Sequence, residues 1–292
     1  MRQVIELETT VSTSKGAGAV ATRNRLPILE RDALHAADVI AVAEGEALAL
    51  VVDGYYSKEA CAKLTELLLR ASDLWTGYPP EVGADHIHIL GTPLYNCLGE
   101  EFSPDCTEYF EKAPARNRDL RNAVAPLIHP ADRVRIELDN EWPAGATLLR
   151  IAGRPAFFGL CRFIRSGGGM EPHTDRADWD LPCDETSRIR SQLFLNAYLT
   201  QAAAGGDLEL WSMEVRTQAD YDALRSGETP YALDRALLPE PDATLSIEPG
   251  ALVIANASRP HAVTPCEGGG ERLSVSGFLG YSGPQEPLRV FS

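Results

Sequence analysis

The sequence predicts a mainly β protein with flanking helices, of the α+β class, built around an antiparallel sandwich or jelly roll. The second half of the chain consists of short apolar segments separated by glycine and proline turns, which is typical of antiparallel sheets. The helical patterns lie in the first half. The 24 glycines and 20 prolines also favour many turns over long helices.

The first part of the chain is predicted to hold a lead-in followed by a buried strand. Residues 1–25 form a small and polar run that we expect to be flexible. Residues 26–149 are expected to form a region of mixed helices and strands. The apolar run that begins at residue 47 predicts a short buried strand, which ends at Asp53 and Gly54.

A helix is expected to follow this strand. Ser57 is placed to cap its N-terminus, and the helix should run to about Ala71. Its apolar face consists of Ala60, Leu64, Leu67 and Leu68. Frequent prolines then divide the chain into short pieces, so only helical turns near 105–112 and 115–128 are predicted there.

The second half, 150–292, is predicted to be the β core of a single domain that spans 26–292. Its five expected strands are 157–165, 193–199, 207–212, 251–255 and 272–281. Residues 213–244 are expected to form an insertion between two strands. Long loops on a rigid barrel often shape the substrate pocket, so we expect this role for the insertion.

The candidate site begins with the tripeptide His173-Thr174-Asp175. Side chains two positions apart in an extended segment point the same way, so His173 and Asp175 are expected side by side. His261 follows a later strand, which is expected to bring it across the barrel to them. Two imidazoles and one carboxylate form the facial triad that holds non-heme iron(II). The alternative is that Asp175 caps a turn by bonding nearby backbone amides.

An arginine after the second histidine is the next candidate. The loop 265–270 is expected to be a hairpin, and in the strand after it Arg272 and Ser274 share one face. An inward-facing guanidinium needs an anion, and it binds a carboxylate through two parallel N–H donors. The alternative is an exposed arginine paired with Glu267 or Glu271.

Further candidates lie on other segments. Phe194, Asn196 and Tyr198 share one face of their strand, and this mixed face is expected to line the pocket. Arg162 lies on an otherwise apolar strand face and is a second candidate partner for an anion. A structural hydrogen-bonding role is the alternative for each polar residue. Trp179 is a candidate for the pocket wall.

Together these residues resemble the signature of the iron(II)/2-oxoglutarate-dependent oxygenases: His173-x-Asp175, His261 and Arg272-x-Ser274. The match covers roughly residues 150–282, and it implies a double-stranded β-helix, or jelly-roll, core. More loosely, the segments 205–210 and 276–282 resemble the freestanding alkaloid halogenases and their hydroxylase relatives.

The resemblance implies a role for each candidate residue. The implied iron(II) ligands, which form the catalytic centre, are His173, Asp175 and His261. The residues expected to bind the co-substrate 2-oxoglutarate are Arg272, Ser274, Arg162 and Asn196. The residues expected to contact the substrate are Tyr198 and Trp179.

One residue departs from the halogenase pattern. The halogenases keep a glycine or alanine where this chain has Asp175, and that opens a place for chloride on the iron. The carboxylate therefore favours a dioxygenase that uses O2 to hydroxylate an unactivated C–H bond of a small molecule and releases succinate and CO2. An amino-acid derivative or a specialised metabolite is the expected substrate.

Other reactions stay open at this point. Desaturation, cyclisation and epimerisation begin with the same hydrogen abstraction. A zinc hydrolase would use the same ligands with a bound water, but it gives no role to Arg272. A barrel that binds a small molecule without catalysis is the alternative from another class.

Composition excludes several classes of partner. The net charge of -15 disfavours nucleic acid, because phosphate binding needs clustered Lys and Arg. Neither an apolar signal-peptide core nor a run of about 18 apolar residues occurs, so we expect a cytoplasmic protein without a membrane partner. The six scattered cysteines are expected to be free and mostly buried thiols.

Overall fold

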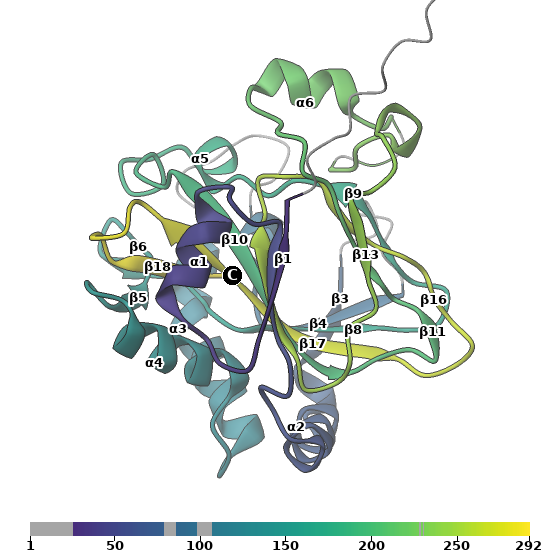
Figure 1. Ribbon diagram of the computed structural model, residues 1–292. Helices are drawn as coiled ribbons and strands as arrows, with labels where there is room; N and C mark the ends of the chain where they lie inside the picture. The colour runs from purple at the N-terminus through teal and green to yellow at the C-terminus, as the bar shows by residue number, and fades with distance from the viewer. Residues whose placement is uncertain (1–25, 79–85, 98–106, 228, 230) are drawn as a thin grey trace, which may run out of the picture.

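A computed structural model describes residues 26–78, 86–97, 107–227, 229 and 231–292 (Figure 1). The predicted flexible lead-in, 1–25, lies outside the described residues. Two facing β-sheets form a jelly roll, and helices cover the outer face of the larger sheet (Figure 1). The predicted mainly β class with a jelly-roll core is confirmed.

The larger sheet carries the longest strands. In sheet order its strands are β1 (Ile28–Arg31), β2 (Ala49–Val52), β14 (Leu252–Asn256), β10 (Ser191–Thr200), β17 (Arg272–Tyr281), β8 (Leu160–Ile164), β4 (Ile87–Leu90) and β3 (Trp75–Gly77). β17 also pairs with β18 (Leu288–Phe291), which pairs with β5 (Ala146–Leu148). Four of the predicted strands correspond to β8, β10, β14 and β17.

The smaller sheet holds the strands that the sequence signals least. In sheet order they are β13 (Ala243–Leu245), β12 (Leu208–Leu210), β15 (His261–Val263) and β9 (Met170–His173). Only β12 is among the predicted strands, because segments of three or four residues are too short to show a clear alternation. The expected insertion lies between β12 and β13, which pair with each other, although its last residues already belong to β13.

The predicted hairpin at 265–270 is wrong. β15 and β17 lie in different sheets, and β16 (Cys266–Glu267) instead pairs with β11 (Ala204–Gly205). Three successive glycines, Gly268, Gly269 and Gly270, all adopt positive φ. This backbone conformation, which glycine adopts without strain, lets the chain pass from one sheet to the other.

The helices pack mainly on the outer face of the larger sheet. α1 (Ala36–Ala43) and α2 (Lys58–Arg70) pack against β10, and α4 (Pro130–Glu141) packs against β17. Ser57 caps α2 as predicted, since its Oγ accepts a hydrogen bond from the backbone N of Ala60 at 3.2 Å. The remaining short elements are η1 (Ser72–Leu74), η3 (Leu94–Cys97), β6 (Arg150–Ile151), β7 (Arg154–Pro155), α5 (Ala177–Asp180), α6 (Gln218–Leu224) and η4 (Arg235–Leu237).

Two helices differ from the prediction because of their prolines. α3 (Thr107–Val124) is a single helix that contains Pro114, where the sequence predicts two separate pieces. Proline removes one backbone donor, and burial of Tyr109 and Phe110 in the preceding turns offsets that loss. Pro130 begins α4, a helix that the sequence does not predict. Proline is well suited to the first position of a helix, where its missing N–H has no partner in any case.

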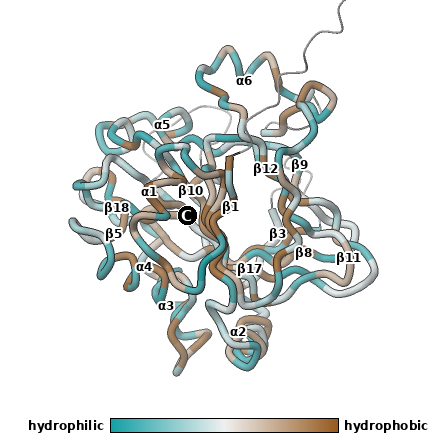
Figure 2. The backbone as a smooth tube through the Cα atoms, viewed as in Figure 1, coloured by the Kyte–Doolittle hydropathy of each residue, from teal (hydrophilic) through white to brown (hydrophobic). Residues whose placement is uncertain are grey.

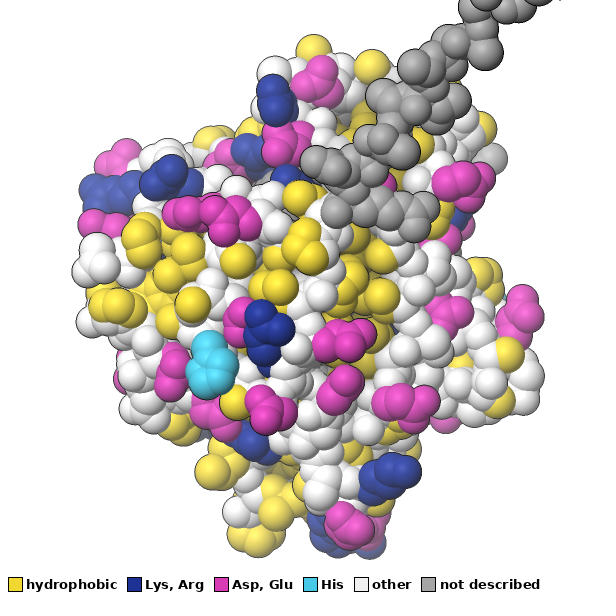
Figure 3. Space-filling view, viewed as in Figure 1, with side chains coloured by type: hydrophobic (Ala, Val, Ile, Leu, Met, Phe, Trp, Pro, Cys, Tyr) yellow, Lys and Arg dark blue, Asp and Glu magenta, His cyan; other side chains and the backbone are white. Residues whose placement is uncertain are grey.

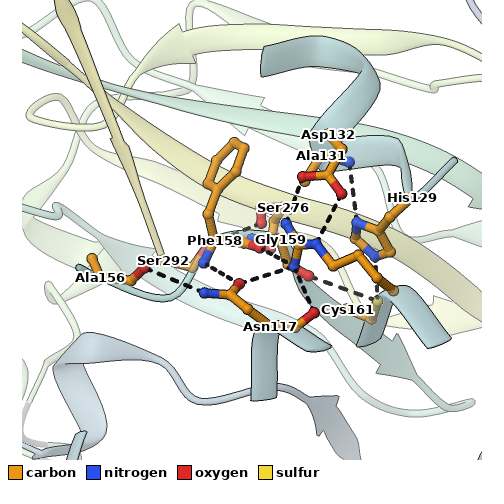
Figure 4. A network of polar contacts seen from close by, with 11 residues as sticks. Asn117, His129, Ala131, Asp132, Ala156, Phe158, Gly159, Cys161, Ser276 and Ser292 are labelled. Atoms are coloured by element: carbon orange, nitrogen blue, oxygen red, sulfur yellow. Dashed lines mark hydrogen bonds and ion pairs between the residues drawn. The ribbon is translucent and has the colours of Figure 1, made fainter. Parts of the chain in front are cut away.

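A polar network joins the helices to the sheet (Figure 4). Arg121 of α3 donates hydrogen bonds to Asp132 near the start of α4 at 2.7 and 2.8 Å, and to the carbonyl O of Phe158 at 3.2 Å. Ser292 Oγ donates to the carbonyl O of Ser276 in β17 at 3.2 Å. The network therefore fixes the two helices relative to β8 and β17.

One face of the larger sheet looks toward the smaller sheet. The register places Tyr198 of β10 and Arg162 of β8 on either side of Ser274 in β17, and directly opposite residues point to the same side of a sheet. That side is the inner one, because Phe194, which shares it, has its ring 4.8 Å from the ring of His261. The predicted mixed face of β10 therefore lines the interior.

The core and the surface agree with the composition. Hydrophobic residues gather along the central strands (Figure 2), and a continuous buried cluster joins these strands to the N-terminal helices. Acidic side chains are scattered over the face shown in Figure 3. Cys61, Cys161, Cys183 and Cys266 are free, and all but Cys183 are buried, as predicted. None of the helices in the described part of the chain is long and apolar enough to cross a membrane.

Candidate metal centre

Three potential metal ligands meet where β9 ends and β15 begins. His173 ends β9, His261 begins β15, and the two residues are partners in the sheet register. Asp175 follows β9, and its Oδ2 lies 3.8 Å from Nε2 of His173 and 3.4 Å from Nε2 of His261. One ligand atom from each residue lies within 4.8 Å of the others. His261 therefore comes from the neighbouring strand, and not from across the barrel as the sequence predicts.

Backbone carbonyls fix the orientation of both imidazoles. Nδ1 of His173 lies 2.7 Å from the carbonyl O of Glu171, and Nδ1 of His261 lies 3.0 Å from the carbonyl O of Arg259. A carbonyl oxygen only accepts, so each Nδ1 carries the proton and donates it. The lone pair of each Nε2 is left on the side of Asp175. Histidines that bind metals are commonly held in this way.

The carboxylate of Asp175 turns toward the histidines, and its Oδ2 lies 3.4 Å from Nε2 of His261. Its backbone N donates to the carbonyl O of Ala257 at 2.8 Å, which ties this loop to the segment before β15. The side chain therefore adopts the direction that a ligand needs, in contrast to the turn-capping alternative.

The protonation states also fit a divalent metal ion. Burial and the neighbouring His261 lower the pKa of His173 to about 4, so this imidazole is neutral near pH 7. Burial alone would raise the pKa of Asp175, but His261, His173 and Arg162 together lower it. Metal–ligand bonds of about 2.1 Å at right angles place donor atoms roughly 3 Å apart. The two separations from Asp175, 3.4 and 3.8 Å, are slightly longer than this value, and two imidazoles with one carboxylate are the ligand set of non-heme iron(II).

Arg272 begins β17 deep inside the jelly roll, where 2% of its surface is exposed. Its Nη1 donates to Ser274 Oγ at 3.3 Å and its Nη2 to the Tyr198 hydroxyl at 3.2 Å. Its Nε is buried without a hydrogen-bond partner. The alternative of an exposed arginine paired with Glu267 or Glu271 is wrong. Because a buried charge without a counter-ion is costly, this guanidinium needs an anion.

A second interior arginine, Arg162 of β8, lies close enough to the metal ligands for its charge to act on them. Its Nη1 donates to Ser276 Oγ at 2.5 Å, and its Nε donates to the Tyr78 hydroxyl at 3.1 Å. Its positive charge lowers the pKa of both Asp175 and His173. Both hydrogen-bond partners are neutral hydroxyls, so Arg162 can also receive an anion.

The structure places the two β10 candidates on the inner face. Tyr198 is fully buried beside Arg272, whose guanidinium carbon lies 4.8 Å from the centre of the Tyr198 ring. Asn196 is half-buried and lies opposite Ser276 in β17. Tyr198 is therefore next to Arg272, and Asn196 is next to Ser276, the hydrogen-bond partner of Arg162.

The insertion brings two tyrosines to the metal end. The ring of Tyr231 packs edge-on against His173, with 5.6 Å between the ring centres. Tyr221 of α6 donates a hydrogen bond to the carbonyl O of Tyr231 at 2.9 Å. Trp179, in α5 just after the metal loop, lies 6.5 Å from the Tyr221 ring.

Some residues around the metal are missed by the sequence reasoning, among them Tyr78, Tyr95, Asp180 and Gln192. Gln192 Nε2 donates to the Tyr95 hydroxyl at 3.0 Å. The tyrosines come from the first half of the chain, where no spacing relates them to the metal motif. Gln192 continues the alternation of the inner face of β10, so extending that pattern by one step would have found it.

Comparisons with known proteins point to one family. The family model of the carrier-protein-independent halogenase WelO5 matches residues 29–292 of this chain. A curated relative is the L-gamma-glutamyl-L-propargylglycine hydroxylase of Streptantibioticus cattleyicolor. It is 25% identical over 194 residues, which are 65% of this chain and 69% of the relative.

Solved structures show the same fold. An N-substituted L-amino acid dioxygenase from Burkholderia ambifaria AMMD has a TM-score of 0.57 and 17% identity, over 88% of this chain and 91% of that one. Its complex with alpha-KG has a TM-score of 0.56 at the same identity and coverage.

Proposed function

The chain belongs to the carrier-protein-independent halogenase WelO5 family of iron(II)- and 2-oxoglutarate-dependent oxygenases, and from this premise we propose that it hydroxylates an unactivated C–H bond of a small amino-acid derivative. Its cofactors are iron(II), 2-oxoglutarate and O2. The three candidate ligands would hold the metal on one face and leave the opposite face to 2-oxoglutarate and O2.

Asp175 is the observation that carries the choice of hydroxylation. The alkaloid halogenases that this chain resembles keep a glycine or alanine at that position, where chloride then binds the metal. Here a carboxylate oxygen lies 3.4 and 3.8 Å from the two imidazole nitrogens. Because this oxygen occupies the position that chloride would need, Asp175 favours transfer of a hydroxyl group.

The bound iron(II) ion supplies the activation of O2 and the oxidation of the C–H bond. The side chains of this protein contribute geometry and charge. The Nδ1–H groups of His173 and His261 donate hydrogen bonds to backbone carbonyls, so both Nε2 atoms keep one direction throughout the reaction. Tyr231, packed edge-on against His173, helps to exclude water from the metal end.

The two interior arginines match the two carboxylates of 2-oxoglutarate. We assign the carboxylate far from the metal to Arg272, with the hydroxyls of Ser274 and Tyr198 beside it. We assign the carboxylate near the metal to Arg162, whose charge already acts on Asp175. The dianion would thereby balance both buried guanidinium charges.

This assignment changes the expected role of Tyr198 and leaves the expected roles of Asn196 and Trp179 as they were. Tyr198, expected to contact the substrate, would bind the co-substrate through its contact with Arg272. Asn196, on the same inner face, keeps its expected place beside 2-oxoglutarate. Trp179, whose ring lies 6.5 Å from that of Tyr221, keeps its expected contact with the substrate.

The substrate class rests on the relatives. The curated relative hydroxylates a γ-glutamyl amino acid by its name, and it matches 65% of this chain. The solved dioxygenase that shares the fold acts on N-substituted L-amino acids by its name. These names support an amino-acid derivative as the substrate of this chain.

The test begins with anaerobic addition of iron(II) and 2-oxoglutarate, which should produce the weak visible charge-transfer band of their complex. Oxygen is then admitted with γ-glutamyl dipeptides and N-acyl amino acids in excess chloride. We expect succinate and a product heavier by one oxygen atom, with no chlorine isotope pattern in its mass spectrum. A chlorinated product would overturn the choice of hydroxylation, and the absence of both band and succinate would overturn the oxygenase.

A further inference from the structure

A carboxylate close enough to Asp175 to feel its charge forms no ion pair among the described residues. Asp180 ends α5, the short helix that begins two residues after Asp175. The neighbouring cation, Arg176, is engaged elsewhere, since its guanidinium donates to Asp178 at 2.7 and 2.9 Å and lies 4.1 Å from the Trp179 ring centre. The Asp180 carboxylate accepts a hydrogen bond from the Arg176 backbone and feels the charge of Arg176, but the ion pair of that arginine is with Asp178.

Hydrogen bonds hold α5 against the inner face of the larger sheet. The backbone N of Ala177, the first residue of α5, donates to Gln192 Oε1 at 2.9 Å. Gln192 lies two residues before Phe194, whose ring is 4.8 Å from that of His261. The loop that carries Asp180 is thus anchored beside the metal ligands.

Aromatic rings surround the same region. Tyr95 accepts a hydrogen bond from Gln192 and packs edge-on against Phe278, with 5.7 Å between the rings. The Trp179 and Tyr221 rings lie 6.5 Å apart. Aromatic faces together with a carboxylate are the combination that attracts an ammonium group.

The charges around Asp180 favour a cation as its partner. Burial and the negative charge of Asp175 raise the pKa of Asp180 to about 7. The charge of Asp180 in turn raises the pKa of Tyr95 and Tyr221, although burial is the larger cause for both. A positive group bound here would offset the unfavourable burial of a carboxylate.

We propose that Asp180 binds a protonated amino group of the substrate, with the rings of Trp179, Tyr95 and Tyr221 around it. The enzyme then acts on amino-acid derivatives whose amine is free. This assignment rests on the proposed function and narrows its substrate class. It also agrees with the roles of the two interior arginines. Both are assigned to 2-oxoglutarate, so the residues around Asp180 remain to recognise the substrate.

The experiment compares free amines with their N-acetyl counterparts. L-amino acids and γ-glutamyl dipeptides, each paired with its N-acetyl form, are added to the enzyme with iron(II), 2-oxoglutarate and O2, and succinate is measured. At least one free amine should stimulate succinate formation with a lower KM than its N-acetyl counterpart. Asp180→Asn, which keeps the shape and removes the charge, should raise that KM at least about tenfold and change kcat less.

Asp184→Asn is the matched control, because it removes an exposed carboxylate from the same loop. It should leave both kinetic constants unchanged. The proposal is overturned if no free amine is preferred over its N-acetyl form, or if Asp180→Asn keeps the KM of the wild type. The charge-transfer band separates the two failures, since an intact band without amine preference rejects only the role of Asp180.

Discussion

The two ends of the interior are built in opposite ways. At the metal end the ligands come from the smaller sheet and its loops, and backbone carbonyls orient both imidazoles. At the far end Arg272 belongs to the larger sheet, and its hydrogen bonds within the described part of the chain go to the neutral hydroxyls of Ser274 and Tyr198. The first end offers electron pairs to a cation and the second offers N–H donors to an anion. A 2-oxo acid bound to the metal would reach from the metal ligands to Arg272. The distance between the two sheets therefore sets the length of the co-substrate that fits.

Loss of a metal ligand should have the largest effect. His173→Ala and Asp175→Ala should each lower iron(II) affinity by more than about 100-fold, because even residues that only support ligands are worth about 10–100-fold. Hydroxylation should fall to background in both variants. Anaerobic iron titration measures the affinity directly.

The comparison of the two ends supplies the control for this experiment. Arg272→Ala should leave iron affinity at the wild-type value, since Arg272 contacts no ligand. If His173→Ala and Asp175→Ala bound iron as tightly as the wild type, the ligands would have to be sought elsewhere.

Arg272→Met should have the next largest effect, on 2-oxoglutarate. Removing one partner of a buried charge pair costs about 2–5 kcal/mol, so the KM for 2-oxoglutarate should rise at least about 30-fold. Without 2-oxoglutarate the variant should be as stable as the wild type or more stable, because a buried charge without a counter-ion has been removed. Thermal melting with and without 2-oxoglutarate measures both effects, since only the wild type should be stabilised by the ligand. A variant that melts far below the wild type without ligand would show that Arg272 serves the fold.

A co-substrate with one carboxylate sharpens the assignment of the two arginines. 2-Oxobutanoate keeps the keto acid that binds next to the metal and has no far carboxylate. Arg272→Ala should therefore change its KM little, whereas Arg162→Met should raise the KM of both 2-oxo acids by about tenfold, the loss of one charge-assisted hydrogen bond. Formation of propanoate and succinate is measured for each pair. If Arg272→Ala raised the KM of both co-substrates equally, Arg272 would bind the carboxylate near the metal and the assignment of the two arginines would be reversed.

The residues that could be predicted from the sequence are those that local spacing signals. His173 and Asp175 stand two residues apart, and Arg272 follows His261 at the start of a strand whose alternation is clear from Arg272 to Ser276. The bounds predicted for that strand, 272–281, are those of β17. Long strands in the middle of a sheet show their faces in the sequence, because both neighbours impose the same alternation.

The tyrosines and the carboxylate around the metal ligands could not be predicted in the same way. Tyr95 lies in η3 and Tyr231 in the insertion, and both reach the metal end only through tertiary packing. Asp180 carries no sequence signal of its own, since an acidic residue in a loop is usually solvated. Its environment includes Tyr95, which comes from a distant part of the sequence and whose pKa the charge of Asp180 raises, after burial and Asp175.

The smallest effect should come from Asp180 in the metal-free protein. Its pKa in the fold is raised to about 7, chiefly by burial and then by Asp175, against about 3.9 in an unfolded chain. The fold thus favours the protonated form, and the stability from this group is present below about pH 4 and is lost as pH rises through 7. Asp180→Asn should therefore have a higher melting temperature than the wild type at about pH 8, and this difference in melting temperature should become smaller toward about pH 5. About 1 kcal/mol corresponds to roughly 2–4 °C, so calorimetry can resolve the difference in melting temperature.

Asp184→Asn is the control, and its melting temperature should equal that of the wild type at both pH values. Iron(II) balances the charge of Asp175, so it should reduce the difference between Asp180→Asn and the wild type. If the difference in melting temperature between Asp180→Asn and the wild type were the same at both pH values, ionisation of Asp180 would not be its cause.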